Sequence, residues 1–360
     1  MRLRIFIILL LFGLLNMPQQ MNGEDLGSNR SSKAITTHLA KDSLQMLTDS
    51  RSDAQQCLDG LAWQPEQFEV SFQPADNERY DGKLNFPSAR TSGNARLDTV
   101  VLEWFAAREH QKTVVSDRVV LVVHELGSSM PFGKTIARQL SAFGVHTFLI
   151  HLPHYADRKT ESKMSGGEKL VSGMPQAVAD IRRSRDAIMQ WPELKAQEIA
   201  LVGLSLGGIL SATTGSLDAS FDSVHLLLAG GDLNGILTNG RKEPEKVMQS
   251  LKASGFDESQ IALAISRVEP LRIAHRLNPE TTWLYTGRYD TTIPRANSDA
   301  LAECIGLKSS HRIMMLADHY TGAIFLPLIV ANIAHVINGK EEIQDQPATE
   351  VDSTPAALEN

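Results

Sequence analysis

The chain has 360 residues, of which 42% are hydrophobic and 21% charged, and its formal net charge at pH 7 is −7. This length and composition are those of a globular protein with a sizeable core, organised as one large domain or two small ones. The acidic balance argues against a nucleic-acid partner, because phosphate binding requires a cationic surface.

The N-terminus carries a targeting pattern. Arg2 and Arg4 flank the start of an apolar run, IFIILLLFGLL (5–15). This run has the length of the hydrophobic region of a secretory signal and is short for a membrane-spanning helix. We therefore expect residues 1–23 to be a signal peptide and the protein to be exported, either periplasmic or secreted. The cleavage site is poorly marked, which leaves an uncleaved anchor as the alternative. Membrane contact is expected only if this segment is retained.

Two segments near the ends of the chain are polar. Residues 24–62 are weakly helical and are expected to form a leader packed loosely on the domain. Residues 339–360 are acidic, contain few large apolar side chains and are expected to be disordered. The two cysteines, Cys57 and Cys304, could pair in an oxidising compartment, but the sequence does not place them within bonding distance.

Between these ends, short apolar runs alternate with helical patterns. The eight runs expected to be strands are EQFEVSFQ (66–73), TVVLEWFAA (99–107), RVVLVVHE (118–125), HTFLIHLP (146–153), EIALVGLS (198–205), SVHLLLAGG (223–231), TTWLYTG (281–287) and HRIMMLAD (311–318). Most runs from the third onward are continuously apolar, as in strands covered on both faces. The alternation predicts an α/β fold over residues 63–338, with a doubly wound, mostly parallel eight-stranded sheet and helices on both faces. The first two runs have little helical pattern between them, which indicates an antiparallel start.

Two other segments stand out between and after these strands. Residues 231–267 separate the sixth and seventh strands and carry two short helical patterns. They are expected to form a small partial cap, with a plain surface excursion as the alternative. The apolar run 322–337 is interrupted by Pro327, Asn332 and His335, so it is expected to be a buried terminal helix rather than a membrane span.

The fifth strand runs into Gly203-Leu204-Ser205-Leu206-Gly207, which matches the pattern G-x-S-x-G. The string alone is a weak signal, but a strand before it and a small apolar helical pattern after it supply the context of a nucleophile elbow. A serine hydroxyl also needs a base, and the base needs an orienting group. Asp290 directly follows the seventh strand and His319 directly follows the eighth, in the order that this architecture requires. Asp318 is a rival carboxylate, although an immediate sequence neighbour does not easily reach the His319 ring.

Through GLSLGG, GRYDTTIP and DHYTG, with VVHELG as a weaker match, the chain resembles the α/β-hydrolase superfamily over about residues 65–338. It looks nearest to the single-domain esterase-like and dienelactone-hydrolase-like members. The resemblance implies that Ser205 is the nucleophile, His319 the general base and acid, and Asp290 the orienting carboxylate.

The resemblance also implies an oxyanion hole made by the backbone N–H groups of Leu206 and Leu126. In the loop that carries Leu126, Glu125 stands where the family usually has glycine. A carboxylate there could weaken the stabilisation of the oxyanion, unless its side chain points away.

Five other side chains are expected to line the pocket: His124, Glu125, His151, His154 and Tyr320. The H-x-x-H spacing of His151 and His154 raises the possibility of a metal. However, no third ligand lies at suitable spacing, so no metal is expected.

The sequence as a whole predicts a serine hydrolase that cleaves a small-molecule carboxylic ester through an acyl-enzyme, without cofactor or metal. A peptidase, a thioesterase or a dienelactone hydrolase with the same triad is the alternative of like chemistry. A catalytically silent binding protein on the same fold is the alternative of another class. Nothing in the sequence predicts an oligomeric state.

Overall fold

The computed structural model describes residues 34–45, 48–76 and 78–339. The signal peptide predicted over residues 1–23 and nearly all of the tail predicted over 339–360 lie outside the described residues. Within the described ranges, no helix is both long and apolar enough to cross a membrane.

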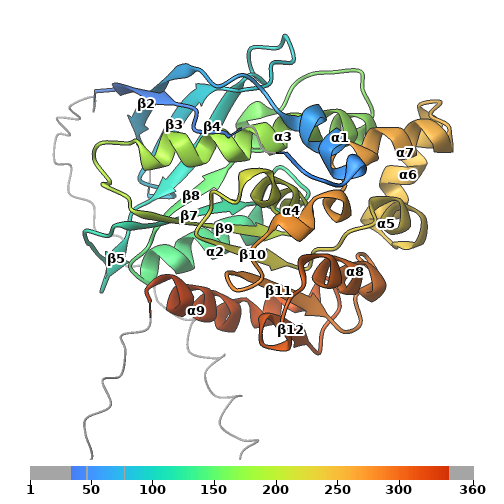
Figure 1. Ribbon diagram of the computed structural model, residues 1–360. Coiled ribbons are helices and arrows are strands. Elements are labelled where there is room, and N and C mark those ends of the chain that lie inside the picture. The colour runs from blue at the N-terminus through green and yellow to red at the C-terminus, as the bar shows by residue number, and fades with distance from the viewer. Residues whose placement is uncertain (1–33, 46–47, 77, 340–360) are drawn as a thin grey trace, which may run out of the picture. The chain divides into compact units, whose positions relative to one another are not determined.

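In the described part of the chain, ten strands form one sheet with helices on both faces (Figure 1). The strands are β1 (Thr36–Lys41), β2 (Gln67–Pro74), β3 (Gly82–Pro87), β4 (Thr99–Phe105), β7 (Arg118–Val123), β8 (His146–Ile150), β9 (Glu198–Leu204), β10 (Ser223–Leu227), β11 (Thr282–Gly287) and β12 (Arg312–Met315). Their order in the sheet is β1-β2-β3-β4-β8-β7-β9-β10-β11-β12. The pairs from β1 to β8 are antiparallel and the remaining pairs are parallel. A separate small hairpin joins β5 (Arg108–Glu109) and β6 (Lys112–Thr113).

The α/β fold, the mostly parallel sheet and the antiparallel start are as predicted, but the number of strands is not. All eight predicted strands are present, and β1 and β3 are additional. Strand β1 lies at the edge of the sheet and buries only Ala40, so it carries almost no apolar pattern. Strand β3 is short and buries Leu84 and Phe86 between polar residues. Each strand is short and buries few side chains, so each leaves only a weak signal in the sequence.

The helices divide between the two faces of the sheet. The side chains of α2 (Pro131–Ala142) and α9 (Leu326–Ile337) join one hydrophobic cluster. Those of α1 (Ser52–Leu61), α3 (Gly166–Met189), α4 (Leu206–Asp218) and α8 (Arg295–Ile305) join the other. Three helices, α5 (Leu233–Asn239), α6 (Glu243–Ala253) and α7 (Glu258–Ser266), lie together between β10 and β11 in the chain (Figure 1). The short 3-10 helices are η1 (Ala156–Arg158), η2 (Pro270–Arg272), η3 (Ala274–Arg276), η4 (Ser309–His311) and η5 (Thr321–Phe325).

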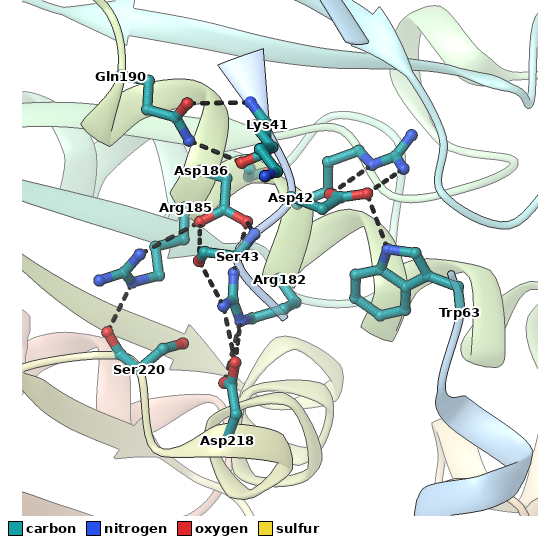
Figure 2. Close-up of polar contacts among 12 residues, drawn as sticks. Lys41, Asp42, Ser43, Trp63, Arg182, Arg185, Asp186, Gln190, Asp218 and Ser220 are labelled. Carbon is teal, nitrogen blue, oxygen red and sulfur yellow. Dashed lines mark hydrogen bonds and ion pairs between the residues drawn. The ribbon is translucent and has the colours of Figure 1, made fainter. Parts of the chain in front are cut away.

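The segment predicted as a loose leader is fastened to α3 by buried ion pairs and hydrogen bonds. Asp42 accepts a hydrogen bond from Trp63 Nε1 at 3.1 Å, and Ser43 Oγ donates to Asp186 at 2.6 Å (Figure 2). The guanidinium of Arg183 on α3 pairs with Asp42, and both side chains are 0% exposed. Buried charges are tolerated only when they are paired in this way. The described residues of the predicted leader, 34–45 and 48–62, therefore lie in the same compact unit as the rest of the described chain.

Both cysteines are free thiols in different contacts. Cys57 Sγ donates to the carbonyl oxygen of Arg267 at 3.6 Å, and Cys304 Sγ donates to that of Leu271 at 3.4 Å. The disulfide considered from the sequence is not formed.

Candidate active site

The predicted elbow lies between β9 and α4, and Ser205 is its turning residue. The φ angle of Ser205 is 55° and its ψ angle −116°, a conformation that a residue with a side chain rarely adopts. Such backbone strain costs on the order of 1–3 kcal/mol and persists where the surroundings enforce it. Here the Ser205 N–H donates to the carbonyl oxygen of Leu227 on β10 at 2.8 Å, which ties the turn to the neighbouring strand.

Two glycines allow helix α4 to begin directly above the strands. A Cβ atom at Gly207 would lie 2.1 Å from the carbonyl oxygen of Val123, at the end of β7. A Cβ atom at Gly203 would lie 2.3 Å from the carbonyl oxygen of Gly207. Only glycine fits at either position, because the two backbones approach each other so closely.

The structure brings Ser205, His319 and Asp290 together from the ends of three strands. Ser205 Oγ lies 2.9 Å from His319 Nε2, and His319 Nδ1 lies 2.7 Å from Asp290 Oδ2. The other carboxylate oxygen of Asp290 accepts the backbone N–H groups of Thr292 and Ile293 at 2.8 and 2.9 Å. These bonds hold the carboxylate in one orientation. With the Nδ1 proton donated to Asp290, Nε2 is left to accept the proton of the serine hydroxyl.

Asp318, the rival carboxylate, is engaged elsewhere. Its Oδ1 accepts the backbone N–H groups of Tyr320 and Thr321, both at 2.8 Å, and so stabilises the turn that follows β12. The side chain of Asp318 therefore faces away from the His319 ring.

An apolar cavity of about 290 Å³ adjoins Ser205 and His319. The segment 231–267 forms three helices where two were predicted. The cap residues that line the cavity are Leu233, Ile236, Leu237, Glu243, Pro244, Val247 and Ile265. The segment is therefore a wall of the cavity rather than a plain surface excursion.

No protein-family model and no curated protein matches the sequence. Solved structures do resemble it. An acetyl xylan esterase from Paenibacillus sp. R4 matches with a TM-score of 0.56 and 13% identity, over 81% of this chain and 96% of that one. The chain has the α/β-hydrolase fold. Acetyl xylan esterase 1 from Thermoanaerobacterium sp. JW/SL YS485 matches with a TM-score of 0.52 and 11% identity, over 74% of this chain and 85% of that one. At these identities the likeness concerns the fold alone.

Glu125, the unusual residue of this α/β-hydrolase fold, binds the start of a helix. Its two carboxylate oxygens accept the backbone N–H groups of Phe132 and Gly133, at 2.9 and 3.0 Å. These are N-terminal amides of α2, whose N-cap residue Met130 makes no side-chain hydrogen bond. A carboxylate is favoured at this end of a helix, where unpaired N–H groups carry partial positive charge. Although Glu125 borders the cavity, both oxygens are thus already engaged.

The two residues predicted to form an oxyanion hole also border the cavity. Leu206 is the first residue of α4, so its N–H has no acceptor within the helix. Leu126 lies in the loop after β7, next to Gly127, whose φ of 128° is accessible to glycine.

Three histidines predicted to line the pocket do not border it, and that prediction is wrong. His124 is fully buried; its Nδ1 donates to the carbonyl oxygen of Glu125 at 2.5 Å, and its Nε2 accepts the N–H of Leu152 at 3.2 Å. Burial lowers the pKa of His124 to about 3, so the ring is neutral. It braces the end of β7 against the end of β8.

Of the other two histidines, His151 faces the antiparallel part of the sheet and His154 contacts a loop residue. His151 Nε2 lies 3.2 Å from a carboxylate oxygen of Glu103 on β4, and His154 Nδ1 lies 3.3 Å from Thr160 Oγ1. Strand β8 stands between β4 and β7, two strands from Ser205, which explains the orientation of His151. Among the described residues, no three His, Cys, Asp or Glu side chains are grouped as metal ligands would be.

Tyr320 does border the cavity, and it links the His319 loop to the cap. Its hydroxyl donates to Glu243 Oε2 at the start of α6, and the Lys242 ammonium lies 3.9 Å from the centre of its ring. Burial, and next the hydrogen bond to Glu243, raise the pKa of Tyr320 to about 12. Sequence reasoning did not find Glu243 as its partner.

Sequence reasoning also missed the apolar side chains that two long helices contribute to the cavity. These are Leu170, Val171 and Met174 from α3, and Leu326 and Ile329 from α9. A helical hydrophobic pattern indicates that such residues are buried, but not which of them face a cavity.

Proposed function

We propose that the protein is a serine hydrolase that cleaves a carboxylic ester through an acyl-enzyme on Ser205. The observation that carries this proposal is the hydrogen-bonded chain from Ser205 through His319 to Asp290, built on a strained strand-to-helix turn. A hydroxyl, an imidazole and a buried carboxylate in this sequence of contacts are the elements of nucleophilic acyl transfer.

In the proposed reaction, His319 Nε2 takes the proton of Ser205 as Oγ attacks the carbonyl carbon of the ester. The backbone N–H groups of Leu206 and Leu126 stabilise the resulting oxyanion, each contributing on the order of 10²–10³ in rate. His319 then gives its proton to the leaving alcohol oxygen. Asp290 holds the ring in the required tautomer and stabilises its cationic form.

Water completes the cycle. It attacks the acyl carbon while His319 again removes a proton. As the second tetrahedral intermediate breaks down, the bond to Ser205 Oγ breaks, His319 returns the proton to Oγ, and the acid is released.

An ester is favoured over a peptide by the charges around the cavity. Of the two carboxylates that border it, Glu125 binds α2 and Glu243 binds Tyr320. Among the described residues that line the cavity, this leaves no free charge for the terminus of a peptide. The two similar structures reported above are both esterases, which supports the same choice.

The test uses a fluorophosphonate probe, which reacts with activated serines. The wild-type protein should be labelled, and Ser205→Ala should not, with its fold verified by circular dichroism. A folded wild-type protein that resists labelling would identify a silent binding protein instead. Nitrophenyl esters, a thioester and aminoacyl anilides, assayed side by side, then identify the scissile bond. An anilide or thioester that is hydrolysed faster than every ester would overturn the choice of a carboxylic ester.

We also propose that the protein is exported, on the strength of the pattern in residues 1–23. Fusion of these residues to a reporter that is active only after export should give activity, and replacing Arg2, Arg4 and the apolar run should abolish it. Mass spectrometry of the exported protein would distinguish a cleaved signal from a retained anchor.

A further inference from the structure

The cavity beside Ser205 has two apolar walls that belong to different hydrophobic clusters. The first wall is formed by α3, α4 and the cap, with Val171, Met174, Ile209, Ile236, Val247 and Ile265. The second wall lies on the other side of the sheet, with Leu227, Leu228, Met315, Ala323, Leu326 and Ile329. The cavity therefore straddles the edge of the sheet where the parallel strands end.

Ser205 stands at the junction of these two walls. The residue before it, Leu204, packs in the cluster of the second wall, and the residue after it, Leu206, packs in the cluster of the first wall. A carbonyl carbon attacked by Ser205 Oγ carries one substituent on each side. Each substituent can then lie against an apolar wall.

The size of the cavity limits what these substituents can be. Its volume of about 290 Å³ is roughly twice that of the engineered 150 Å³ apolar cavity that accommodates benzene. This allows on the order of ten to twelve carbon atoms in total. It is more than an acetyl group needs.

The polar groups around the cavity are few, and the carboxylates there are already hydrogen-bonded within the protein. Glu125 and Glu243 are hydrogen-bonded within the protein, and Asp290 is bonded to His319. Besides Ser205 and Tyr320, the hydroxyl-bearing residues among the described lining residues are Ser129 and Thr292. A sugar bound here would lose the water on its hydroxyl groups without finding enough partners to replace it.

We propose that the substrate is an uncharged ester with an apolar group on each side of the ester bond, together about ten to twelve carbons, rather than an acetylated sugar. This inference rests on the proposed ester hydrolysis at Ser205. It specifies the chemistry on both sides of the scissile bond.

The first experiment measures kcat/KM of the wild-type protein by pH-stat on two series of uncharged esters. One series lengthens the acyl chain with ethanol as the alcohol, and the other lengthens the alcohol with acetate as the acid. In each series kcat/KM should rise about fourfold for each added methylene group, until the lengthened chain fills its side of the cavity. Acetylated xylose should be at least a hundredfold poorer than hexyl butyrate. Flat or falling series, or a preference for acetylated xylose, would overturn the inference.

Two variants test which wall holds which side of the ester. Val247→Trp places a larger side chain on the first wall, and Ala323→Phe places a larger side chain on the second wall. Each should shorten the chain length at which one series reaches its plateau and leave the other series unchanged. Leu263→Trp is the matched control, because Leu263 is 64% exposed on α7 and does not border this cavity. A variant that alters both series equally, or neither, would show that the cavity is not divided in this way.

Fluorophosphonate labelling separates failure of this inference from failure of the proposed function. If Ser205 is labelled but the ester preference differs from the expected one, only the inference of a substrate with two apolar groups is overturned. Absence of labelling in a folded protein would overturn the proposal that the protein is a serine hydrolase. If a narrowing variant does not fold, the two ester series on the wild-type protein still decide the matter.

Discussion

His319 is hydrogen-bonded to Asp290, which lies 29 residues earlier in the chain, and its sequence neighbour Asp318 is turned away from it. Asp290, in the loop after β11, accepts the ring N–H of His319, whereas Asp318, in the loop after β12, accepts backbone N–H groups of the following turn. This difference allows the orienting role of Asp290 to be tested against a control that lies next to the same histidine.

Asp290→Asn should lower kcat on the best ester by about 10⁴-fold with little change in KM, because an amide can donate to Nδ1 and hold the ring in the wrong tautomer. Asp318→Asn should keep kcat within about threefold of wild type, since Asp318 supports only the turn. Steady-state kinetics of both variants, with thermal unfolding as a check of the fold, provide the measurement. Equal losses in the two variants would contradict the assignment.

The hydrogen bonds of Glu125 to α2 predict separate effects on stability and on rate. Glu125→Ala should lower the free energy of unfolding by about 1–2 kcal/mol, because the N-terminal amides of α2 lose their acceptors. Glu125→Gln keeps one acceptor oxygen and should cost less. Urea unfolding measures both effects.

The kcat of Glu125→Gln also reports on the oxyanion. The kcat should stay within about threefold of wild type, because both oxygens of this carboxylate already accept N-terminal amides of α2. A tenfold gain in kcat would mean instead that the carboxylate opposes the developing oxyanion.

The close approach at Gly207 predicts that one methyl group disrupts the elbow. In Gly207→Ala the new Cβ would lie 2.1 Å from a backbone carbonyl oxygen, so α4 must shift and carry Ser205 away from His319. We expect kcat/KM to fall at least a hundredfold. Gly60→Ala is the control, because no atom lies within 4 Å of a Cβ at this position in α1. It should raise stability by up to about 1 kcal/mol, through helix propensity. Activity in Gly207→Ala close to wild type would refute the tight packing.

Buried histidines predict loss of stability in acid. Burial, with a smaller contribution from His311, lowers the pKa of His225 to about 3, well below its ordinary value of 6.5. Between these pH values the unfolded chain binds a proton at this residue and the folded protein does not. Stability is therefore fully present above pH 6.5 and falls with pH, by about 1.4 kcal/mol per pH unit for this group.

Replacing His225 should make the unfolding free energy depend less steeply on pH. His225→Phe keeps an aromatic ring beside Trp283, whose ring centre lies 4.8 Å away, and removes the titrating group. Between pH 6.5 and 4, the slope of the unfolding free energy against pH should decrease by the equivalent of about one bound proton. The exposed His335 offers a control, and His335→Gln should retain the wild-type slope. Equal slopes for His225→Phe and wild type would contradict the account.

The sequence was sufficient for the elements whose signal is local. The continuous apolar runs predicted eight of the ten strands, because strands covered on both faces must be apolar throughout. The elbow at Ser205 was recognisable because its glycines and its flanking strand and helix are adjacent in sequence. Asp290 and His319 were found because each follows directly on a strand, and the ends of parallel strands meet at one edge of the sheet.

Tertiary structure alone decided the rest. Strands β1 and β3 are short and bury few side chains, and they are identified by their backbone pairing with β2 and, for β3, also with β4. His151 and Ser205 both follow a buried strand, yet the order of strands in the sheet directs the first toward Glu103 on β4, away from the cavity. The hydrogen-bond partners of Glu125 could not be predicted from the sequence either, because they depend on where α2 begins. Periodicity and turn chemistry are properties of short segments, whereas strand order and cavity walls arise from contacts between residues far apart in the chain.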